Sequence, residues 1–320
     1  MKRPLCLAVA CIAALAGATS LRAGDGEAVT EAFITSQLGD SLSIVDLETM
    51  TVKTEVNIGG KPAGVAVAPG GARAYVTSPD SKELSIVDVA SRAVTAKVKV
   101  GQGPLGVASD VKRNRVIVAD WYEHKIYAVD GDSGAIVGEA QVGQSPSGVA
   151  MTSDGGRIVT ADRDSNQISI LDATTLKTIG TVGVGERPFG VTIDAAGAFA
   201  YTANVQSDDV SIIDLGKMTL VATVKVGSRP YAVALAAGKA FVTNQHGESV
   251  SVIDLATRTV VKTIPVGSYP EGIAATPDGR HVFVACWDDN TLEKIDVETL
   301  TVTAKATVAA GPRAFGAFLR

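Results

Sequence analysis

Residues 226–234 read VGSRPYAVA, and close copies of this stretch return along the whole chain. The copies read IGGKPAGVA, VGQGPLGVA, VGQSPSGVA, VGVGERPFGVT, VGSYPEGIA and, in degraded form, AAGPRAFGA. Gly and Pro recur in every copy, whereas the residues that touch the proline change each time. The prolines are 42 residues apart, except for one step of 40, at Pro62, Pro104, Pro146, Pro188, Pro230, Pro270 and Pro312. Self-similarity at a fixed period predicts seven copies of one structural unit.

Each unit contains four short apolar or alternating runs. In one unit they read GVAVA (64–68), RAYVTS (73–78), LSIVDV (84–89) and VTAKVKV (94–100). Runs of this length and pattern are typical of β-strands, and a Gly-containing turn such as 277–279 suits a tight hairpin between the first two. Four strands in every unit predict an all-β fold, namely a seven-bladed β-propeller of four-stranded antiparallel blades.

An aspartate closes the third run of every unit, at Asp46, Asp88, Asp130, Asp172, Asp214, Asp254 and Asp296. Aspartate side chains cap turns by accepting backbone hydrogen bonds, so a residue repeated in each unit indicates geometry rather than a metal or catalytic site. The one short step lies between Pro230 and Asp254, which predicts that one turn is trimmed by two residues.

The two ends of the repeat array complement each other. Residues 33–36 resemble a second strand that has no first strand before it, whereas Pro312 opens a first strand with nothing after it. We therefore expect residues 313–319 to supply the innermost strand of the N-terminal blade, because this closure pairs both end strands.

The N-terminus has the pattern of a secretory signal. Lys2 and Arg3 precede the apolar run LCLAVACIAALAGA, which ends in small residues. The predicted organisation is a signal peptide at 1–23, a lead-in at 24–31 and a single propeller domain at 32–320; cleavage after Ala18 and lipidation at Cys11 are the alternatives. The run is short for a membrane span, so we expect a monomeric protein, periplasmic or secreted, without a transmembrane segment.

Removal of residues 1–23 also changes charge and cysteine content. The net charge falls from -5 to -8, because three basic residues and no acidic ones are lost. A general polyanion binder is therefore disfavoured. Cys286 becomes the single cysteine, which predicts a free thiol and no internal disulfide.

The repeat resembles the YVTN family of seven-bladed β-propellers. The resemblance covers residues 32–320 and is carried by AYVTS (74–78), AYTAN (200–204) and FVTNQ (241–245), each followed by a VSVID-like strand. It implies a periplasmic or surface protein. One characterised relative in this family resembles a single-stranded DNA binder, and neighbouring propeller families include sugar lactonases, amine dehydrogenase subunits and the haem-d domain of nitrite reductases.

Sequence motifs for chemistry are missing. The chain has no CxxCH, GxSxG, Walker or HExxH motif. Its three histidines, His124, His246 and His281, belong to different units, which favours surface or structural roles over a shared metal site. The sequence thus predicts no catalytic residue, no metal ligand and no cofactor.

The variable residues fall on one face of the predicted ring, in the loops before first strands and between second and third strands. Beside the prolines they are Lys61, Arg187, Phe189, Arg229, Tyr231, Tyr269, Glu271 and Arg313; in the other loops they include Trp121, Tyr122, Glu123, His124, His246, Trp287 and Asp288. Arginines that engage an anionic group, beside aromatic rings that stack or pack, predict a recognition surface. The alternative is that the aromatics cap neighbouring blades and the arginines pair locally.

Three functions remain open. The first is an exported, non-enzymatic propeller that binds a small anionic or aromatic ligand, or a periplasmic partner protein, on this face. The second is a lactonase-like hydrolase or a quinone- or haem-linked redox accessory, with Glu123, His124, Glu271 and Asp288 as the acid–base candidates. The third is a single-stranded nucleic-acid binder, which Arg–aromatic surfaces suit but the net charge disfavours.

Overall fold

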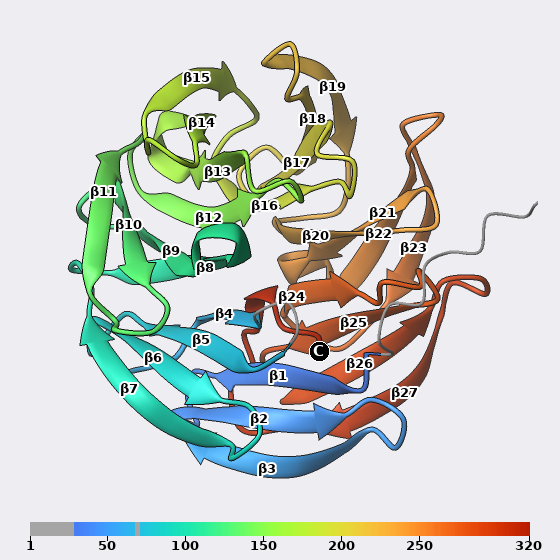
Figure 1. Ribbon diagram of the computed structural model, residues 1–320. Helices are drawn as coiled ribbons and strands as arrows, with labels where there is room; N and C mark the ends of the chain where they lie inside the picture. Colours follow the sequence, from blue (N-terminus) through green and yellow to red (C-terminus); the bar gives the residue numbers. More distant parts are fainter. Residues whose placement is uncertain (1–28, 68–70) are drawn as a thin grey trace, which may run out of the picture.

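A computed structural model describes residues 29–67 and 71–320 and forms a closed ring of seven blades around a central axis (Figure 1). The expected signal peptide, and most of the lead-in, lie outside the described residues. No helix in the described part of the chain has the length and apolar character that a membrane crossing needs. The predicted architecture is confirmed: the blades are four-stranded and antiparallel, with sheet order following chain order.

The strands take four places in the blades, from the axis outward. The innermost strands are β4 (Gly64–Val67), β8 (Pro104–Asp110), β12 (Pro146–Met151), β16 (Pro188–Ile193), β20 (Pro230–Ala236), β24 (Pro270–Ala275) and β28 (Phe315–Ala317). The second strands are β1 (Glu31–Ser36), β5 (Arg73–Ser78), β9 (Arg115–Asp120), β13 (Arg157–Asp162), β17 (Phe199–Asn204), β21 (Lys239–Asn244) and β25 (His281–Cys286). The third strands are β2 (Ser41–Asp46), β6 (Glu83–Asp88), β10 (Lys125–Asp130), β14 (Gln167–Asp172), β18 (Asp209–Asp214), β22 (Ser249–Asp254) and β26 (Thr291–Asp296). The outer strands are β3 (Thr51–Asn57), β7 (Ala93–Lys99), β11 (Ile136–Gln141), β15 (Thr178–Gly183), β19 (Thr219–Lys225), β23 (Thr259–Pro265) and β27 (Thr301–Thr307).

Burial changes from the axis to the rim as the sequence pattern predicts. Second strands such as β25 are almost entirely buried, because other blades pack on both of their faces, whereas β7 alternates between half-buried and exposed positions. The innermost strands crowd together at glycines. A Cβ placed on Gly106 would lie 2.2 Å from the carbonyl oxygen of Ser147 in the next blade, so no larger residue fits without movement.

Buried hydroxyl groups tie several blades to the next. Thr77 donates a hydrogen bond to the carbonyl of Leu105, and Thr243 donates to that of Glu271, in each case a carbonyl of the following blade. Thr35 makes the same bond to Ala63. These bonds satisfy carbonyls that the innermost strands leave unpaired within their own blade.

The turn predictions are confirmed. All seven repeated aspartates accept backbone hydrogen bonds from the turn that follows the third strand, as Asp172 does from the amides of Thr174 and Thr175. The trimmed turn joins β20 to β21 through Ala237 and Gly238 alone, both with positive φ, which is the two-residue connection that suits a tight hairpin.

The ring is closed by its C-terminal segment, as predicted. Residues 312–319 run antiparallel to β1, with bridges from Ala32 to Leu319 and from Ser36 to Pro312. Within this segment, β28 also pairs in parallel with β4 of the second blade. Phe318 is fully buried in a core shared with β1 and β2. The first blade therefore consists of residues 312–319, β1, β2 and β3.

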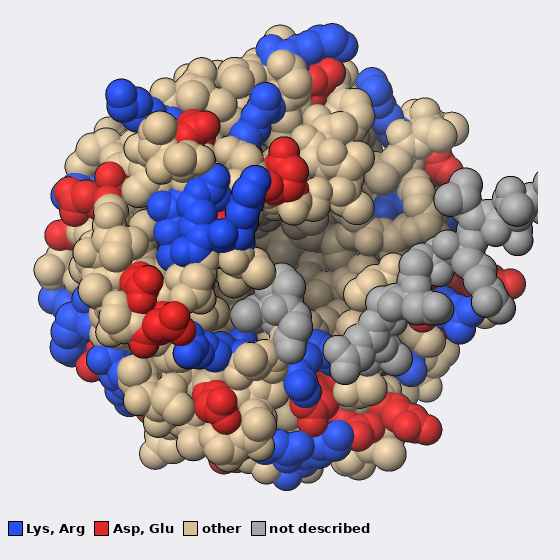
Figure 2. Space-filling model, in the orientation of Figure 1, with Lys and Arg blue, Asp and Glu red and all other residues tan. Residues whose placement is uncertain are grey.

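The ring has two different faces. The loops before the innermost strands lie beside those between second and third strands, as the hydrogen bond from the Trp121 amide to the Gly103 carbonyl shows; we call this side the proline face. It carries the short helices η2 (Arg163–Ser165) and η3 (Gln245–Gly247). The remaining turns and η1 (Val111–Arg113) form the opposite side, the hairpin face, where Figure 2 shows a central hollow whose visible wall is mostly free of charged side chains.

Candidate functional site

The residue that follows each proline lies at the ring axis on the proline face. Around the ring these residues are Ala63, Leu105, Ser147, Phe189, Tyr231, Glu271 and Arg313. The first six are buried and Arg313 is partly buried. Phe189 of the fifth blade packs on Phe315 of the first, and Arg313 contacts Tyr231 with the seventh blade between them. Contacts that skip blades require side chains to meet across the axis, so these seven residues close the channel, and we call them the axial plug.

The plug explains why the residues after the prolines differ. Seven side chains share one volume, and seven copies of a large residue would overfill it while seven small ones would leave it open. Phe189 and Tyr231 fill the centre from neighbouring blades, while Ala63 and Ser147 are small. Proline and glycine fix the backbone identically in each blade, and the side chains between them divide the remaining space.

Aromatic rings form the apolar half of the plug. The ring centroids of Phe189 and Tyr231 are 4.2 Å apart, and those of Phe189 and Phe315 are 5.0 Å apart. Trp121 lies beside the same cluster, with its ring centroid 6.1 Å from that of Phe189. The ring planes are tilted rather than parallel, an arrangement that adds about 0.5–1.5 kcal/mol per pair beyond area burial.

An ion pair forms the polar half. The Arg313 Nε lies 2.8 Å from Oε2 of Glu271, and its Nη2 lies 2.8 Å from the Tyr231 hydroxyl. Gln245 donates to the other carboxylate oxygen at 2.7 Å. Burial raises the pKa of Glu271, while Arg313 and Gln245 oppose that rise. With both carboxylate oxygens occupied, Glu271 holds the plug together and is not a free acid or base.

Arg187 and Arg229 lie at equivalent positions beside the plug and extend into solvent. Both are exposed, and both have left-handed backbones with φ of 55° and 53°. Ion pairs on this face involve Arg163, Arg313 and Lys61, but none involves Arg187 or Arg229 within the described residues. The fold places Ser145 at the same position with the same φ, so folding does not require an arginine there.

Aromatic residues also lie on the proline face. The Arg163 guanidinium lies 5.2 Å from the ring centroid of Trp121. In the sixth and seventh blades, His246 lies 5.3 Å from Tyr269, whose ring lies 6.4 Å from Trp287. The His246 Nε2 and the Tyr269 hydroxyl are 3.0 Å apart and hydrogen-bonded. The proline face thus carries two aromatic groups, one on the plug and one over the last two blades.

The other expected site residues are held locally. Lys61 pairs with Asp40 at 3.3 Å, and His124 accepts a hydrogen bond from the Ser145 amide through Nδ1. Glu123 accepts a hydrogen bond from Tyr127, while Tyr122 and Asp288 are exposed. The acid–base candidates Glu123, His124, Glu271 and Asp288 therefore belong to separate contacts rather than to one catalytic group.

The potential metal ligands and the cysteine are placed as follows. Among the described residues, no three His, Cys, Asp or Glu side chains are placed to hold a metal ion. Cys286 is a free, buried cysteine, and burial raises the pKa of its thiol to about 12. A thiol with that pKa stays protonated and is a weak nucleophile.

Three members of the plug were not identified from the sequence, nor was Phe315, which packs on the plug aromatics. Ala63, Leu105 and Ser147 carry no chemistry that attracts notice, and Phe315 lies three residues after its proline rather than one. The available signal was positional: every residue directly after a repeated proline should share one environment. Phe189, Tyr231 and Glu271 were expected on a recognition surface, and the structure places them beneath it.

The sequence and the fold were compared with known proteins. Residues 156–319 match the family model described as a domain of unknown function (DUF5074), and residues 6–112 match the model described as a YNCE-like β-propeller. No curated protein matches the chain.

Several solved structures have the same fold. Hydrazine synthase of Kuenenia stuttgartiensis superimposes with a TM-score of 0.76 at 18% identity, covering 89% of this chain and 99% of that one. A functionally unknown protein of Desulfotomaculum acetoxidans gives a TM-score of 0.76 at 14% identity over 88% and 98% of the two chains. Dihydro-heme d1 dehydrogenase NirN, in complex with DHE, gives 0.67 at 14% identity over 92% and 77%.

Proposed function

Because this chain belongs to the DUF5074 family, whose description assigns no activity, we propose a function from its proline face: the propeller is an exported, non-enzymatic protein that binds an acidic segment of a partner protein there. The observation that carries the proposal is the pair Arg187 and Arg229. Two exposed guanidinium groups without ion-pair partners in the described chain lie at equivalent positions of neighbouring blades.

The shape of the face favours a protein segment over a small ligand. The axial plug fills the channel on this side, so the arginines stand on a surface rather than in a pocket. Arginine binds carboxylates through two parallel N–H donors, and half-buried aromatics beside it are typical of interface anchors. An extended acidic loop with an aromatic residue would contact Arg187 and Arg229 and pack on Trp121.

The strain at the two arginines supports the same conclusion. A non-glycine residue with positive φ costs about 1 kcal/mol or more, and within the described chain the side chains of Arg187 and Arg229 make no ion pair. Glycine or serine would serve the fold as well, as Ser145 does. An arginine kept at such a position is best explained by a contact outside the molecule.

The test is recovery of partners from periplasmic extract, identified by mass spectrometry, with two variant pairs. We expect Arg187→Ala with Arg229→Ala to lose the partner, with affinity reduced about tenfold to a hundredfold. The matched control is Arg258→Ala with Arg280→Ala, which removes the same charge from two exposed arginines of the hairpin face. Equal recovery with the proline-face pair and with wild type would contradict the proposal.

A redox-accessory role is the second candidate, favoured by two structural neighbours, hydrazine synthase and dihydro-heme d1 dehydrogenase NirN. It predicts visible absorption from a cofactor in the purified protein, or spectral change on titration with haem. The single-stranded nucleic-acid function is tested with a labelled oligonucleotide over a range of salt concentrations, because phosphate contacts weaken steeply as salt rises.

A further inference from the structure

Beneath the axial plug the ring axis is hollow. A cavity of about 570 Å³ lies between the innermost strands and opens to the hairpin face (Figure 2). Ligand pockets commonly enclose about 300–1,000 Å³, so the space is large enough for a small organic molecule. The cavity lies on the far side of the plug from Arg187 and Arg229 and is therefore separate from the proposed partner surface.

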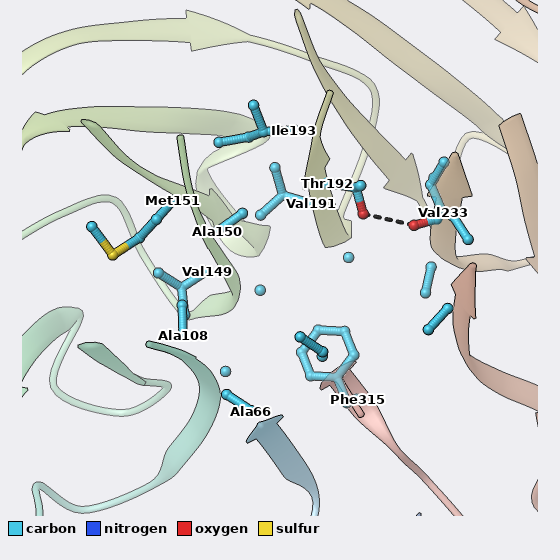
Figure 3. A pocket seen from close by; sticks show the side chains of 18 of the residues that line it. Ala66, Ala108, Val149, Ala150, Met151, Val191, Thr192, Ile193, Val233 and Phe315 are labelled. Atoms are coloured by element: carbon cyan, nitrogen blue, oxygen red, sulfur yellow. Dashed lines mark hydrogen bonds between the residues drawn. The ribbon is translucent and has the colours of Figure 1, made fainter. Parts of the chain in front are cut away.

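The side chains of the wall are almost entirely apolar. Figure 3 shows Ala108, Ala150, Val191 and Met151 around the space, with the Phe315 ring on another side. The hydroxyl of Thr192 donates to the Val233 carbonyl at 2.6 Å. The one ionisable side chain in the described wall is Asp194, and it accepts hydrogen bonds from the amides of Ala198 and Phe199 in its own turn.

The cavity is preformed rather than a gap between mobile elements. Its walls are the innermost strands, which approach one another at glycines such as Gly148, where a Cβ would lie 2.7 Å from the Phe189 carbonyl oxygen. The Ser147 hydroxyl bonds that same carbonyl at 2.8 Å. A rigid wall lowers the conformational entropy that the protein must lose when a ligand binds.

Backbone groups supply the polar part of the wall. The innermost strands β12, β16, β20 and β24 each stand at the edge of their sheets. An edge strand presents N–H and C=O groups that have no partner within the sheet. A largely apolar ligand with one or two hydrogen-bonding atoms would find both donors and acceptors between the apolar side chains.

The basic side chains at the rim are held by groups of the protein itself. Basic side chains gather beside the hollow, over the ends of β8 and β12 (Figure 2). Arg115 and Arg113 both pair with the buried carboxylate of Asp110, and they donate to backbone carbonyls of the next blade. These arginines join blades, and neither of them lines the cavity.

We propose that the axial cavity is a binding site for a small, electrically neutral, largely apolar molecule that enters from the hairpin face. An ion would exchange water for apolar side chains, at a large cost in solvation. A neutral aromatic or aliphatic molecule would displace water from apolar surface and gain about 25 cal/mol per Å². This ligand site is independent of the partner surface on the proline face.

The test uses N-phenylnaphthylamine, a neutral dye whose fluorescence rises in apolar surroundings. We expect saturable binding to wild type, and at least a tenfold loss of affinity in Ala150→Phe with Ala108→Phe, which fills the space from two wall strands. The matched control, Val137→Lys with Val261→Lys, removes the exposed apolar side chains of two outer strands, and it should bind as wild type does. The pair Arg187→Ala with Arg229→Ala should also bind normally, which separates this site from the partner surface.

A measurement on unmodified protein covers the case in which the filled variant does not fold. With carbon-labelled methionine methyl groups, the dye should shift the Met151 resonance, because Met151 lines the cavity. Met50 and Met218 are outside the wall, and their resonances should stay unchanged. No saturable binding to wild type, undiminished binding in a folded filled variant, or a shift at Met50 and Met218 without one at Met151 would overturn the proposal.

Discussion

The two ends of the ring axis are built from the same seven innermost strands, yet one is closed and the other open. On the proline face the strands begin with seven side chains that meet across the axis, and only three of the seven, Phe189, Tyr231 and Arg313, are large enough to span it. A few residues further on, small apolar side chains repeat around the ring and leave a cavity. Repeated positions that share one space must therefore differ, whereas repeated positions that line a wall can remain alike.

Deleting the C-terminal segment, which contributes side chains to both ends of the axis, should have the largest effect on stability. Truncation after residue 311 deletes Arg313 from the plug, Phe315 from the cavity wall and the fully buried Phe318 from the first blade. It also leaves β1 and β4 without their neighbour. We expect loss of the cooperative thermal transition, measured by circular dichroism.

A point change in the same segment provides the control for truncation. Arg320→Ala removes a partly exposed ion pair with Glu31, which keeps Lys53 and Arg92 as partners, and should cost about 1 kcal/mol or less. If the truncated chain melts as the full chain does, closure by residues 312–319 does not stabilise the ring.

Shortening a side chain should cost more stability at the closed end of the axis than at the open end. Phe189→Ala removes the ring at the centre of the plug, where it contacts Trp121, Tyr231 and Phe315, and should lower the free energy of unfolding by about 3–5 kcal/mol. Met151→Ala shortens a half-buried side chain of the open end and should cost about 1 kcal/mol. Denaturant unfolding measures both; similar losses would mean that the plug is no better packed than the cavity wall.

An added methyl group should destabilise the protein where innermost strands meet and should be tolerated on an outer strand. In Gly106→Ala the new methyl group would meet the Ser147 carbonyl oxygen at 2.2 Å, and overpacking of this kind costs about 1–3 kcal/mol. Gly183→Ala places the same methyl group on β15, where nothing lies within 4 Å, so stability should stay equal or rise. Equal unfolding midpoints for the two variants would argue against tight contact between innermost strands.

The smallest effect on stability should come from lowering the pH, and it should arise from turn aspartates on the hairpin face. Turn hydrogen bonds lower the pKa of Asp172 and Asp254, with the amides of Thr175 and Thr257 as the largest causes. Because the folded pKa lies below the unfolded value of about 3.9, the stabilisation is complete above that pH and is lost as the pH falls through the folded pKa. Asp172→Asn with Asp254→Asn should flatten the fall in melting temperature below about pH 4; an unchanged slope would mean that these turns do not contribute.

The sequence predicted the scaffold because its signals are local and repeat. Proline before each first strand, glycine within it and aspartate after each third strand specify the same backbone in every unit, so the strands, the trimmed turn at 237–238 and the closing segment were all predictable. The exposure of Arg187 and Arg229 followed equally from their place in a loop.

The plug was beyond that reasoning for a physical reason. Whether Phe189 faces solvent or the axis depends on the pleat of β16 and on the radius of the closed ring, and neither is a property of a single unit. Seen in one blade, Tyr231 and Glu271 are loop residues beside a proline. Only when the blades converge do Glu271 and Arg313 come within 2.8 Å. The cavity likewise exists only in the assembled ring.

The first blade is built from the two ends of the repeat array, so it can be completed only at the end of synthesis. Residues 31–57 leave the ribosome first, yet the strand that completes their sheet, residues 312–319, is made only after every other blade. Until then β1 has an open edge and the side chains that Phe318 covers are exposed to water. Blades two to seven can form in the order of translation, but the first waits for the last. Until residues 312–319 emerge the ring cannot be sealed, and this is the stage at which a chaperone or a second chain pairing with β1 would compete with folding.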